Sequence, residues 1–228
     1  MPVILAFDVY GTLIDTHGVT EALEQYAGAD AGQFSRAWRE KQLEYAFRRG
    51  LMRQYRDFSV CTSNALDYTC MLHKVELSAA QKQALLKVYS VLPVFDDVKL
   101  GLSRIKESGF SLYAFSNGTA QAVELLLGNA GIREFFSGIV SVDEVRSFKP
   151  DPAVYRHFLK QTASVESDAW LISGNAFDVL GAMSVGMRSA WLQRSPDMLF
   201  DPWGVQPTIT INNLANLAER IIKVLQQS

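Results

Sequence analysis

The sequence predicts an α/β protein: a doubly wound, mainly parallel sheet with a helical subdomain inserted after the first strand. Two observations predict this class. From residue 96 onward, short apolar runs alternate with helical patterns, as in strands joined by crossover helices. Between the apolar runs 3–7 and 110–115 lie roughly a hundred residues of helical pattern, whereas a βαβ unit needs only about 30.

The elements follow in order. The run from Val3 to Phe7 is continuously apolar, which predicts a strand buried on both faces. The insertion, roughly 15 to 95, is predicted to be helical at 33–53, 56–73 and 78–92. Ser78 and Gln81 form a capping box at the start of its last helix, and Pro93 closes that helix.

The remaining elements alternate as a doubly wound sheet requires. They are helix 96–108 (ending at Gly109), strand 110–115, helix 119–130, strand 138–142, helix 151–163, strand 169–173, helix 176–185, strand 188–192, strand-like 208–211 and helix 213–226. We therefore expect a core domain of residues 1–14 and 96–228 and a helical cap subdomain of residues 15–95.

Composition excludes several classes of protein. With 48% apolar and 20% charged residues among 228, the chain is neither disordered nor fibrous. No apolar window is long enough to span a membrane, and the first apolar run is too short for a signal peptide. The net charge of −2 and scattered Lys and Arg do not suggest nucleic-acid binding. Cys61 and Cys70 are too few for a disulfide framework or a zinc site, so we expect reduced thiols and a cytoplasmic protein.

Polar residues follow the predicted strands. Asp8 ends the first strand, 116–119 reads Ser-Asn-Gly-Thr, a loop carries Lys149 before Pro150, and 173–178 reads Ser-Gly-Asn-Ala-Phe-Asp. Singly, each has an ordinary explanation as a turn former, a helix cap or a solvated lysine. Together they indicate an active site, because such sites lie at the carboxyl ends of the strands of a doubly wound sheet.

This order of motifs resembles the haloacid dehalogenase superfamily. The first motif, Asp-x-x-Gly-Thr-Leu, matches residues 8–13. The second, a Ser after a strand, matches Ser116; the third, a Lys before Pro, matches Lys149; the acidic fourth loop matches 173–178. The resemblance spans residues 3 to about 195 and implies a Rossmann-like core with an inserted cap.

Two departures point away from phosphoryl transfer, the commonest chemistry of that superfamily. Phosphoryl-transferring members carry an acidic residue where this chain has Tyr10, and a phenol is a poor acid at neutral pH. Their magnesium-binding Gly-Asp is replaced by Gly174-Asn175, and Mg²⁺ prefers carboxylate oxygen. These departures, and the blocks 8–13 and 38–45, are similar to the L-2-haloacid dehalogenases, which implies no metal and no other cofactor. Glu40 and Gly174 differ from that subfamily, which leaves substrate preference open.

The resemblance implies a mechanism. Asp8 attacks C2 of a 2-haloacid, halide leaves, and water hydrolyses the ester, so that an L-substrate gives a D-2-hydroxy acid. Lys149 keeps Asp8 ionised, Thr12 and Ser173 position it, and Ser116 binds the substrate carboxylate with nearby backbone N–H groups. The halide is expected to lie against Arg39, Asn117 and Phe177, and the expected apolar walls are Tyr10, Leu43 and Phe58.

Some roles stay open at this point. Asp178, with Asn175, either activates the water or simply holds Lys149, and Tyr155 is implied as a neighbour of Lys149. Read alone, Arg39 ends an apolar helical stripe and either meets an anion or extends to solvent. The alternatives to a dehalogenase are a Mg²⁺-dependent phosphatase and a non-catalytic relative that binds an anion or a protein. The resemblance also implies a homodimer that binds a 2-haloacid and halide, with no nucleic-acid or membrane partner.

Overall fold

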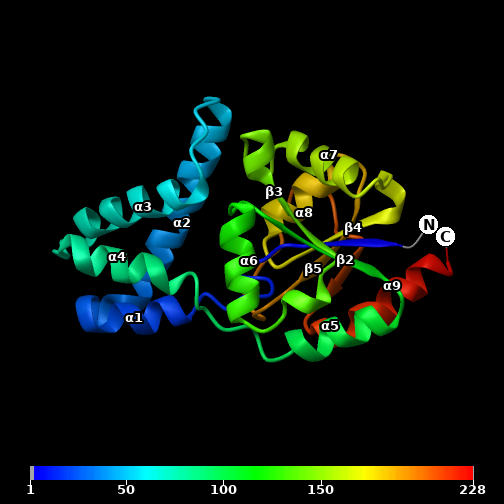
Figure 1. Ribbon diagram of the computed structural model, residues 1–228, viewed down its shortest axis with the longest axis horizontal. Coiled ribbons are helices and arrows are strands. Elements are labelled where there is room, and N and C mark those ends of the chain that lie inside the picture. The colour runs from blue at the N-terminus through cyan, green and yellow to red at the C-terminus, as the bar shows by residue number, and fades with distance from the viewer. Residues whose placement is uncertain (1–2, 228) are drawn as a thin grey trace.

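The computed structural model describes residues 3–227 of the chain and contains one parallel sheet in that range (Figure 1). Its six strands lie in the order β3-β2-β1-β4-β5-β6, and every neighbouring pair is parallel. They are β1 (Ile4–Phe7), β2 (Ser111–Ser116), β3 (Gly138–Ser141), β4 (Ala169–Ser173), β5 (Arg188–Leu192) and β6 (Ile209–Ile211). The predicted doubly wound α/β fold is confirmed; residues 1, 2 and 228 of the expected core domain lie outside the described range.

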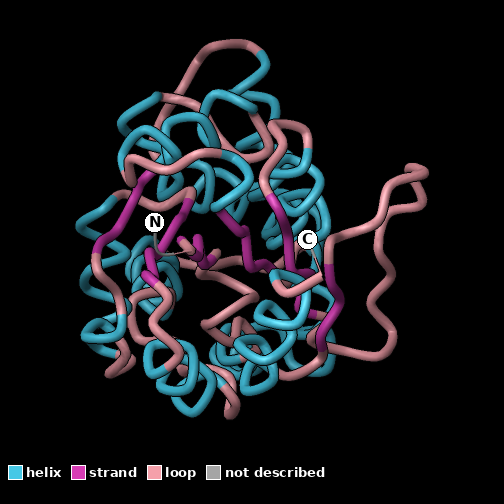
Figure 2. The backbone as a smooth tube through the Cα atoms, turned by 90° about the vertical axis from the view of Figure 1, so that its right-hand side faces the viewer, coloured by secondary structure: helices cyan, strands magenta, loops and turns pink. Residues whose placement is uncertain are grey.

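Strand β1 lies in the middle of the sheet, between β2 and β4. Leu5 and Phe7 point into one hydrophobic core, and Ile4 and Ala6 into the other. All four are buried, which confirms a strand covered on both faces. Figure 2 shows helices on both sides of the strands. The residue that follows β1, Asp8, is therefore held at the centre of the sheet's carboxyl edge.

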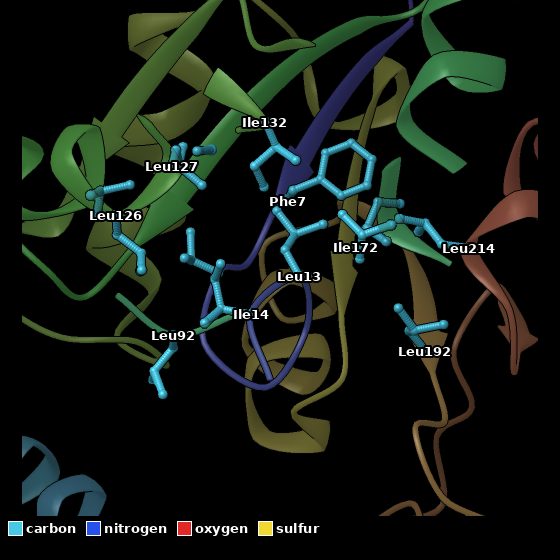
Figure 3. Packing of buried hydrophobic residues seen from close by; sticks show 14 of the residues in the cluster. Phe7, Leu13, Ile14, Leu92, Leu126, Leu127, Ile132, Ile172, Leu192 and Leu214 are labelled. Atoms are coloured by element: carbon cyan, nitrogen blue, oxygen red, sulfur yellow. The ribbon is translucent and has the colours of Figure 1, made fainter. Parts of the chain in front are cut away.

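Helices cover the two faces of the sheet. The face of Phe7 packs against α5 (Val98–Glu107), α6 (Ala120–Asn129) and α9 (Leu217–Leu225). Figure 3 shows this core, with Phe7 and Leu13 beside Ile172 and Leu214. The other face packs against α7 (Pro152–Gln161) and α8 (Ala176–Met183).

Four further helices lie between β1 and α5 in the sequence and beside the sheet in space (Figure 1). We call them the cap helices: α1 (Gly18–Ala27), α2 (Ala31–Leu51), α3 (Phe58–His73) and α4 (Ala79–Val88). The Ser78 capping box is confirmed, with both of its hydrogen bonds formed. Helix α4 ends at Val88 rather than at 92, because turns with Ser90 N–H on the Lys87 carbonyl and Val91 N–H on the Val88 carbonyl replace its last residues.

Helix α1 was not among the predicted helical blocks. Among the described residues no side chain caps its first turn, and Glu21 in that turn is a weak start signal by itself. Its buried Val19 and Leu23 hold it against the rest of the protein. Short 3₁₀ helices fill several connections: Gly28–Asp30, Arg133–Phe135, Val142–Val145, Glu166–Asp168 and Leu214–Asn216, the last being the start of the predicted helix 213–226. Across residues 3–227, none of the helices has the length and apolar character needed to cross a bilayer.

Candidate active site

The carboxylate of Asp8 has two unlike oxygens. Oδ2 accepts hydrogen bonds from Thr12 Oγ1 at 2.7 Å, Asn175 Nδ2 at 2.7 Å and Ser173 Oγ at 3.4 Å. Oδ1 accepts only from Lys149 Nζ, at 3.1 Å, among the interactions of residues 3–227. Three donors therefore fix the orientation of Asp8, and Oδ1 keeps lone-pair capacity for reaction with an electrophile.

Two strand-end loops are joined beneath this carboxylate. Thr12 Oγ1 also accepts from the Gly174 N–H at 2.9 Å. A Cβ added at Gly174 would lie 2.4 Å from the Gly11 carbonyl oxygen, so only glycine allows this approach. Gly11 itself has φ +75°, a conformation that glycine adopts without strain. Gly174, which differs from the subfamily pattern, thus fits the close approach of the Gly11 turn in this chain.

Lys149 is buried and uses all three of its N–H donors. Nζ donates to Asp8 Oδ1, to Asp178 Oδ2 at 2.8 Å and to the Phe115 carbonyl at 2.9 Å, and it lies 4.2 Å from the centre of the Phe115 ring. Burial alone would lower the pKa of Lys149, but the carboxylates of Asp178 and Asp8 outweigh it and raise that pKa. Lys149 is therefore a permanent cation against Asp8.

Asp178 lies behind Lys149, with no exposed surface. Its Oδ2 accepts from Lys149, and its Oδ1 accepts from Tyr155 Oη at 2.7 Å. Burial raises the pKa of Asp178, and Lys149 opposes that rise. Burial and the charge of Asp178 raise the pKa of Tyr155 well above its usual value, so its hydroxyl stays a donor.

A small cavity lies directly over Asp8. Its volume, about 20 Å³, is room for about one water molecule. Its walls come from the sheet edge and from the cap helices: Asp8, Tyr10, Arg39, Leu43, Phe58, Ser116, Asn117, Gly118, Lys149, Asn175 and Phe177. The structure thus gathers ten of the predicted site residues around one space. The other four do not line it: Thr12 and Ser173 donate to Asp8, Asp178 accepts from Lys149, and Tyr155 donates to Asp178.

Several donors around the cavity have capacity to spare. Asn117 Oδ1 accepts from the Lys149 N–H at 2.9 Å, which leaves its NH₂ group for the cavity. Ser116 Oγ accepts from the Gly118 N–H at 3.1 Å, and its own O–H has no acceptor among residues 3–227. Half-buried Arg39 likewise has no hydrogen-bond or ion-pair partner in the described part of the chain, and Glu40 beside it is exposed. These groups can receive an anion.

Two residues near the site were missed by the sequence analysis. Arg194, in the loop after β5, donates from Nε to the Thr12 carbonyl at 3.0 Å and pairs with Asp97 at 2.7 Å. It therefore anchors the turn that carries Thr12. Phe47 on α2 packs edge-on against Phe177, with ring centroids 5.2 Å apart. Phe47 belongs to the apolar helical stripe that Arg39 ends, and nothing local in the sequence marks Arg194.

The donor set of the site is a poor match for a divalent metal. Asn175 turns its amide N–H, not an oxygen, toward Asp8, and the ammonium of Lys149 bridges Asp8 and Asp178. A cation placed between those carboxylates would meet the charge of Lys149. In the described range, His, Cys, Asp and Glu form no group of three or more that could hold a metal ion.

Comparisons with known proteins agree with this geometry. Residues 3–186 match the haloacid dehalogenase-like hydrolase family. The chain is 36% identical to (S)-2-haloacid dehalogenase 2 of Pseudomonas sp. (strain CBS-3), over 93% of each protein. It is 34% identical to haloacetate dehalogenase H-2 of Moraxella sp. (strain B), over 91% of this chain and 92% of that one. The structure of L-2-haloacid dehalogenase from Xanthobacter autotrophicus with chloropropionic acid covalently bound matches it with a TM-score of 0.91 and 26% identity, covering 97% of this chain and 99% of that one.

Proposed function

The chain belongs to the haloacid dehalogenase-like hydrolase family, and we propose that it hydrolyses short-chain L-2-haloalkanoic acids to D-2-hydroxy acids. It is a hydrolase that acts on carbon–halide bonds. The observation that carries this proposal is the buried Asp8, which lines the cavity and is oriented through Oδ2, while Oδ1 accepts from Lys149. The two relatives above, at 36% and 34% identity, are both dehalogenases by name.

In the first step, Asp8 Oδ1 attacks C2 in line with the departing halide. A bond forms between Oδ1 and C2, the carbon–halide bond breaks with its electron pair leaving on the halide, and C2 is inverted. The product is an ester between Asp8 and the substrate. Rigid placement of Asp8 by Thr12 and Asn175 favours this step, because an aligned nucleophile avoids most of the entropic cost of encounter.

Charge compensation accounts for the other cavity residues. Asp8 and a substrate carboxylate at ~5 Å repel by about 3 kcal/mol at an effective dielectric of about 20. Lys149 offsets the charge of Asp8. The Ser116 hydroxyl and nearby backbone N–H groups bind the substrate carboxylate, while Arg39, the Asn117 amide and the ring edge of Phe177 receive the halide. Tyr10, Leu43 and Phe58 surround C2 and its substituent.

In the second step, water adds to the carboxyl carbon of Asp8 and the bond between that carbon and Oδ1 breaks. Oδ1 leaves with C2 as the hydroxyl oxygen of the 2-hydroxy acid, and the oxygen of the water stays in the Asp8 carboxylate. We propose that Asp178, which binds Lys149 in the resting site and does not line the cavity, is freed from Lys149 once the ester has formed. It then takes the proton of the water and returns it to the departing oxygen, while Asn175 holds the Asp8 carboxyl group in place. Two features support this assignment. Burial raises the pKa of Asp178, which makes it a stronger base, and ester formation removes the charge of Asp8 from Lys149.

The assignment has its own test, because holding Lys149 and activating water are separable. Asp178→Asn should still form the ester but hydrolyse it slowly, so intact-protein mass spectrometry after mixing with substrate should find the adduct. If Asp178 only holds Lys149, this variant forms no adduct, since Asp8 loses its counterion arrangement.

We further propose that the reaction needs no metal. The Lys149 ammonium supplies the positive charge that a metal ion would otherwise supply to Asp8. The phosphatase alternative is disfavoured by Tyr10. Burial, with a smaller contribution from Tyr89 and against the effect of Arg39, raises the pKa of Tyr10 to about 12. Its phenol is a poor acid for a leaving alcohol.

Organisation and location are also proposals. We propose that residues 1–14 and 96–228 form the catalytic core and residues 15–95 a cap that closes over it. We propose a homodimer, supported by apolar Met71 and Leu72 on α3, which are 76% and 56% exposed. We propose a cytoplasmic location, which is supported by the free thiols Cys61 and Cys70. We also propose that the protein has no nucleic-acid or membrane partner, because its Lys and Arg residues are scattered along the sequence.

The test of the function is halide release from the separate enantiomers of 2-chloropropionate, with EDTA present and Asp8→Asn as control. We expect chloride and D-lactate from the L-enantiomer only, and none from the variant. Phosphate-ester hydrolysis that appears once Mg²⁺ replaces EDTA, without chloride release, would overturn the proposal. Binding of the 2-haloacid without chloride release or phosphatase activity would favour the non-catalytic alternative.

A further inference from the structure

A second and much larger hollow adjoins the cavity over Asp8. It has a volume of about 630 Å³ and lies between the cap helices and α6, which faces them in Figure 1. Four residues, Tyr10, Arg39, Phe58 and Gly118, line both spaces. We call this hollow the α6 cleft. Its position means that a substrate bound at Asp8 has only these shared residues between it and the cleft.

The walls of the α6 cleft are mainly apolar where they continue from the site. Val60 comes from α3, Leu86 from α4, and Ala122 and Leu125 from α6. Leu125 is 54% exposed although it faces the cap helices, so this apolar surface is left uncovered by the protein itself. The charged lining residues are Arg39, which is shared with the site, and Asp57. The other polar ones are uncharged: Ser59, Thr62, Ser63, Gln83, Ser90 and Thr119.

Geometry selects which part of a substrate would enter the cleft. In an in-line displacement the halide lies opposite Asp8, so the carboxylate and the C2 substituent extend sideways. Ser116 and the neighbouring N–H groups hold the carboxylate, and Arg39 receives the halide. The C2 substituent then lies between Tyr10 and Phe58, which are shared with the cleft.

We propose that the α6 cleft is a binding subsite for the alkyl tail of 2-haloalkanoic acids longer than propionate. This inference rests on the proposed function and extends its substrate class from short-chain to medium-chain acids. The tail should be uncharged, because the negatively charged Asp57 lines the cleft. The Asp57 carboxylate is fixed in place by hydrogen bonds that it accepts from the Ser59 and Val60 N–H groups. A second carboxylate on the tail would be repelled.

The experiment compares halide release from (S)-2-bromopropionate, (S)-2-bromohexanoate and (S)-2-bromooctanoate. In the wild-type protein, kcat/KM should rise by about two- to four-fold per added methylene, as each one leaves water. Octanoate, which carries no halide, should inhibit turnover of 2-bromopropionate more strongly than propionate does. A fall in kcat/KM with each methylene would overturn the proposal.

Two pairs of variants assign the effect to the cleft. Ala122→Trp fills it, and Gln121→Trp places the same side chain on the adjacent exposed position of α6, outside it. Leu125→Asp puts a charge into the cleft. Its control, Leu100→Asp, makes the same change at a leucine on α5 that is 53% exposed and lies outside the cleft. We expect Ala122→Trp and Leu125→Asp to lower kcat/KM for 2-bromooctanoate at least ten-fold and leave 2-bromopropionate within two-fold, with both controls unchanged.

The outcomes are distinguishable from failure of the proposed function. Absence of bromide from every acid, 2-bromopropionate included, would reject the dehalogenase itself. Normal release from 2-bromopropionate with equal effects of Ala122→Trp and Gln121→Trp on 2-bromooctanoate would reject only the cleft as the tail subsite.

Discussion

The two sides of the active-site cavity are built in different ways. On the core side, Asp8, Lys149 and Asp178 are buried, and each charged group contacts at least two hydrogen-bonding partners. On the cap side, Arg39 is half-buried among apolar neighbours and has no hydrogen-bond or ion-pair partner among the described residues. The charged groups of the core side find their partners within the protein, whereas we expect the anions of the substrate to complete the cap side.

From this difference we expect the core side to govern the reactivity of Asp8 and the cap side to govern which substrate binds. Buried charges that are paired can be removed only at a large cost to the folded state. We therefore expect the core cluster of Asp8, Lys149 and Asp178 to be structural as well as catalytic. A half-exposed arginine among apolar side chains contributes little to folding. Substitutions on the core side should therefore lower both activity and stability, and those on the cap side should lower activity alone.

The largest effect is expected from Lys149→Met, which keeps the length of the side chain and removes its charge. Asp8 and Asp178 would then share a buried site without a cation, so the free energy of unfolding should fall by about 3–5 kcal/mol. The value of kcat for 2-chloropropionate should fall by about 10³-fold. Urea denaturation and chloride release measure the two effects.

Lys160→Met is the matched control, because Lys160 is exposed on α7 and does not line the cavity. Lys160→Met should leave both the free energy of unfolding and kcat for 2-chloropropionate close to their wild-type values. A Lys149→Met protein with wild-type stability would contradict the idea that the core cluster is structural as well as catalytic.

Arg39→Gln tests the cap side. Loss of the guanidinium should lower kcat by about 10²-fold, because no other cation on the cap side lines the cavity to receive the departing halide. Stability should stay within about 0.5 kcal/mol of wild type. Arg36→Gln, at an exposed position one turn earlier on α2, is the control and should leave kcat unchanged. A stability loss as large as that of Lys149→Met would remove the distinction between the two sides.

The features that could be predicted from sequence are those determined by residues close together in the chain. The apolar run before Asp8 predicted a buried central strand, and Ser78 with Gln81 predicted the start of α4. The motif residues came together because parallel strands end at one edge of the sheet. Local sequence therefore contains most of the fold, whereas the cavity residues Arg39, Leu43 and Phe58 were expected from the family resemblance.

The features that could not be predicted depend on contacts between distant segments. Arg194 reaches the Thr12 carbonyl across 182 positions, and no local pattern marks it. That Asp178 divides its oxygens between Lys149 and Tyr155 emerged only from the packing of α7 against α8. Helix α1 was missed because packing, not a capping residue, holds it.

Gly181→Ala should give a smaller effect on the core side. A Cβ at Gly181 on α8 would lie 2.3 Å from the Tyr155 hydroxyl oxygen, so Tyr155 would have to move away from Asp178. We expect kcat to fall by about ten-fold and unfolding free energy by about 1–3 kcal/mol. Thermal unfolding and chloride release check both.

Gly128→Ala on α6 is the matched change, since a Cβ there would meet no atom within 4 Å. Because alanine favours a helix more than glycine does, this variant should be more stable by about 0.5–1 kcal/mol with unchanged kcat. Equal losses in the two variants would mean that helix propensity, rather than the position of Tyr155, governs the result.

The smallest effect concerns alkaline pH and the proton on Tyr155. Burial and Asp178 raise the pKa of Tyr155 in the folded protein, so above about pH 10 the unfolded chain loses this proton while the folded protein keeps it. The wild-type free energy of unfolding should therefore decline above pH 10, by up to about 1.4 kcal/mol per pH unit from this group.

The variant Tyr155→Phe lacks the hydroxyl group, so its free energy of unfolding should decline less steeply above pH 10. Below about pH 9 the difference in free energy of unfolding between the variant and the wild type should not change with pH. Urea titrations between pH 8 and 11 measure both slopes. Parallel slopes would mean that Tyr155 loses its proton at the same pH in the folded and the unfolded protein, and that the core cluster is as open as the cap side.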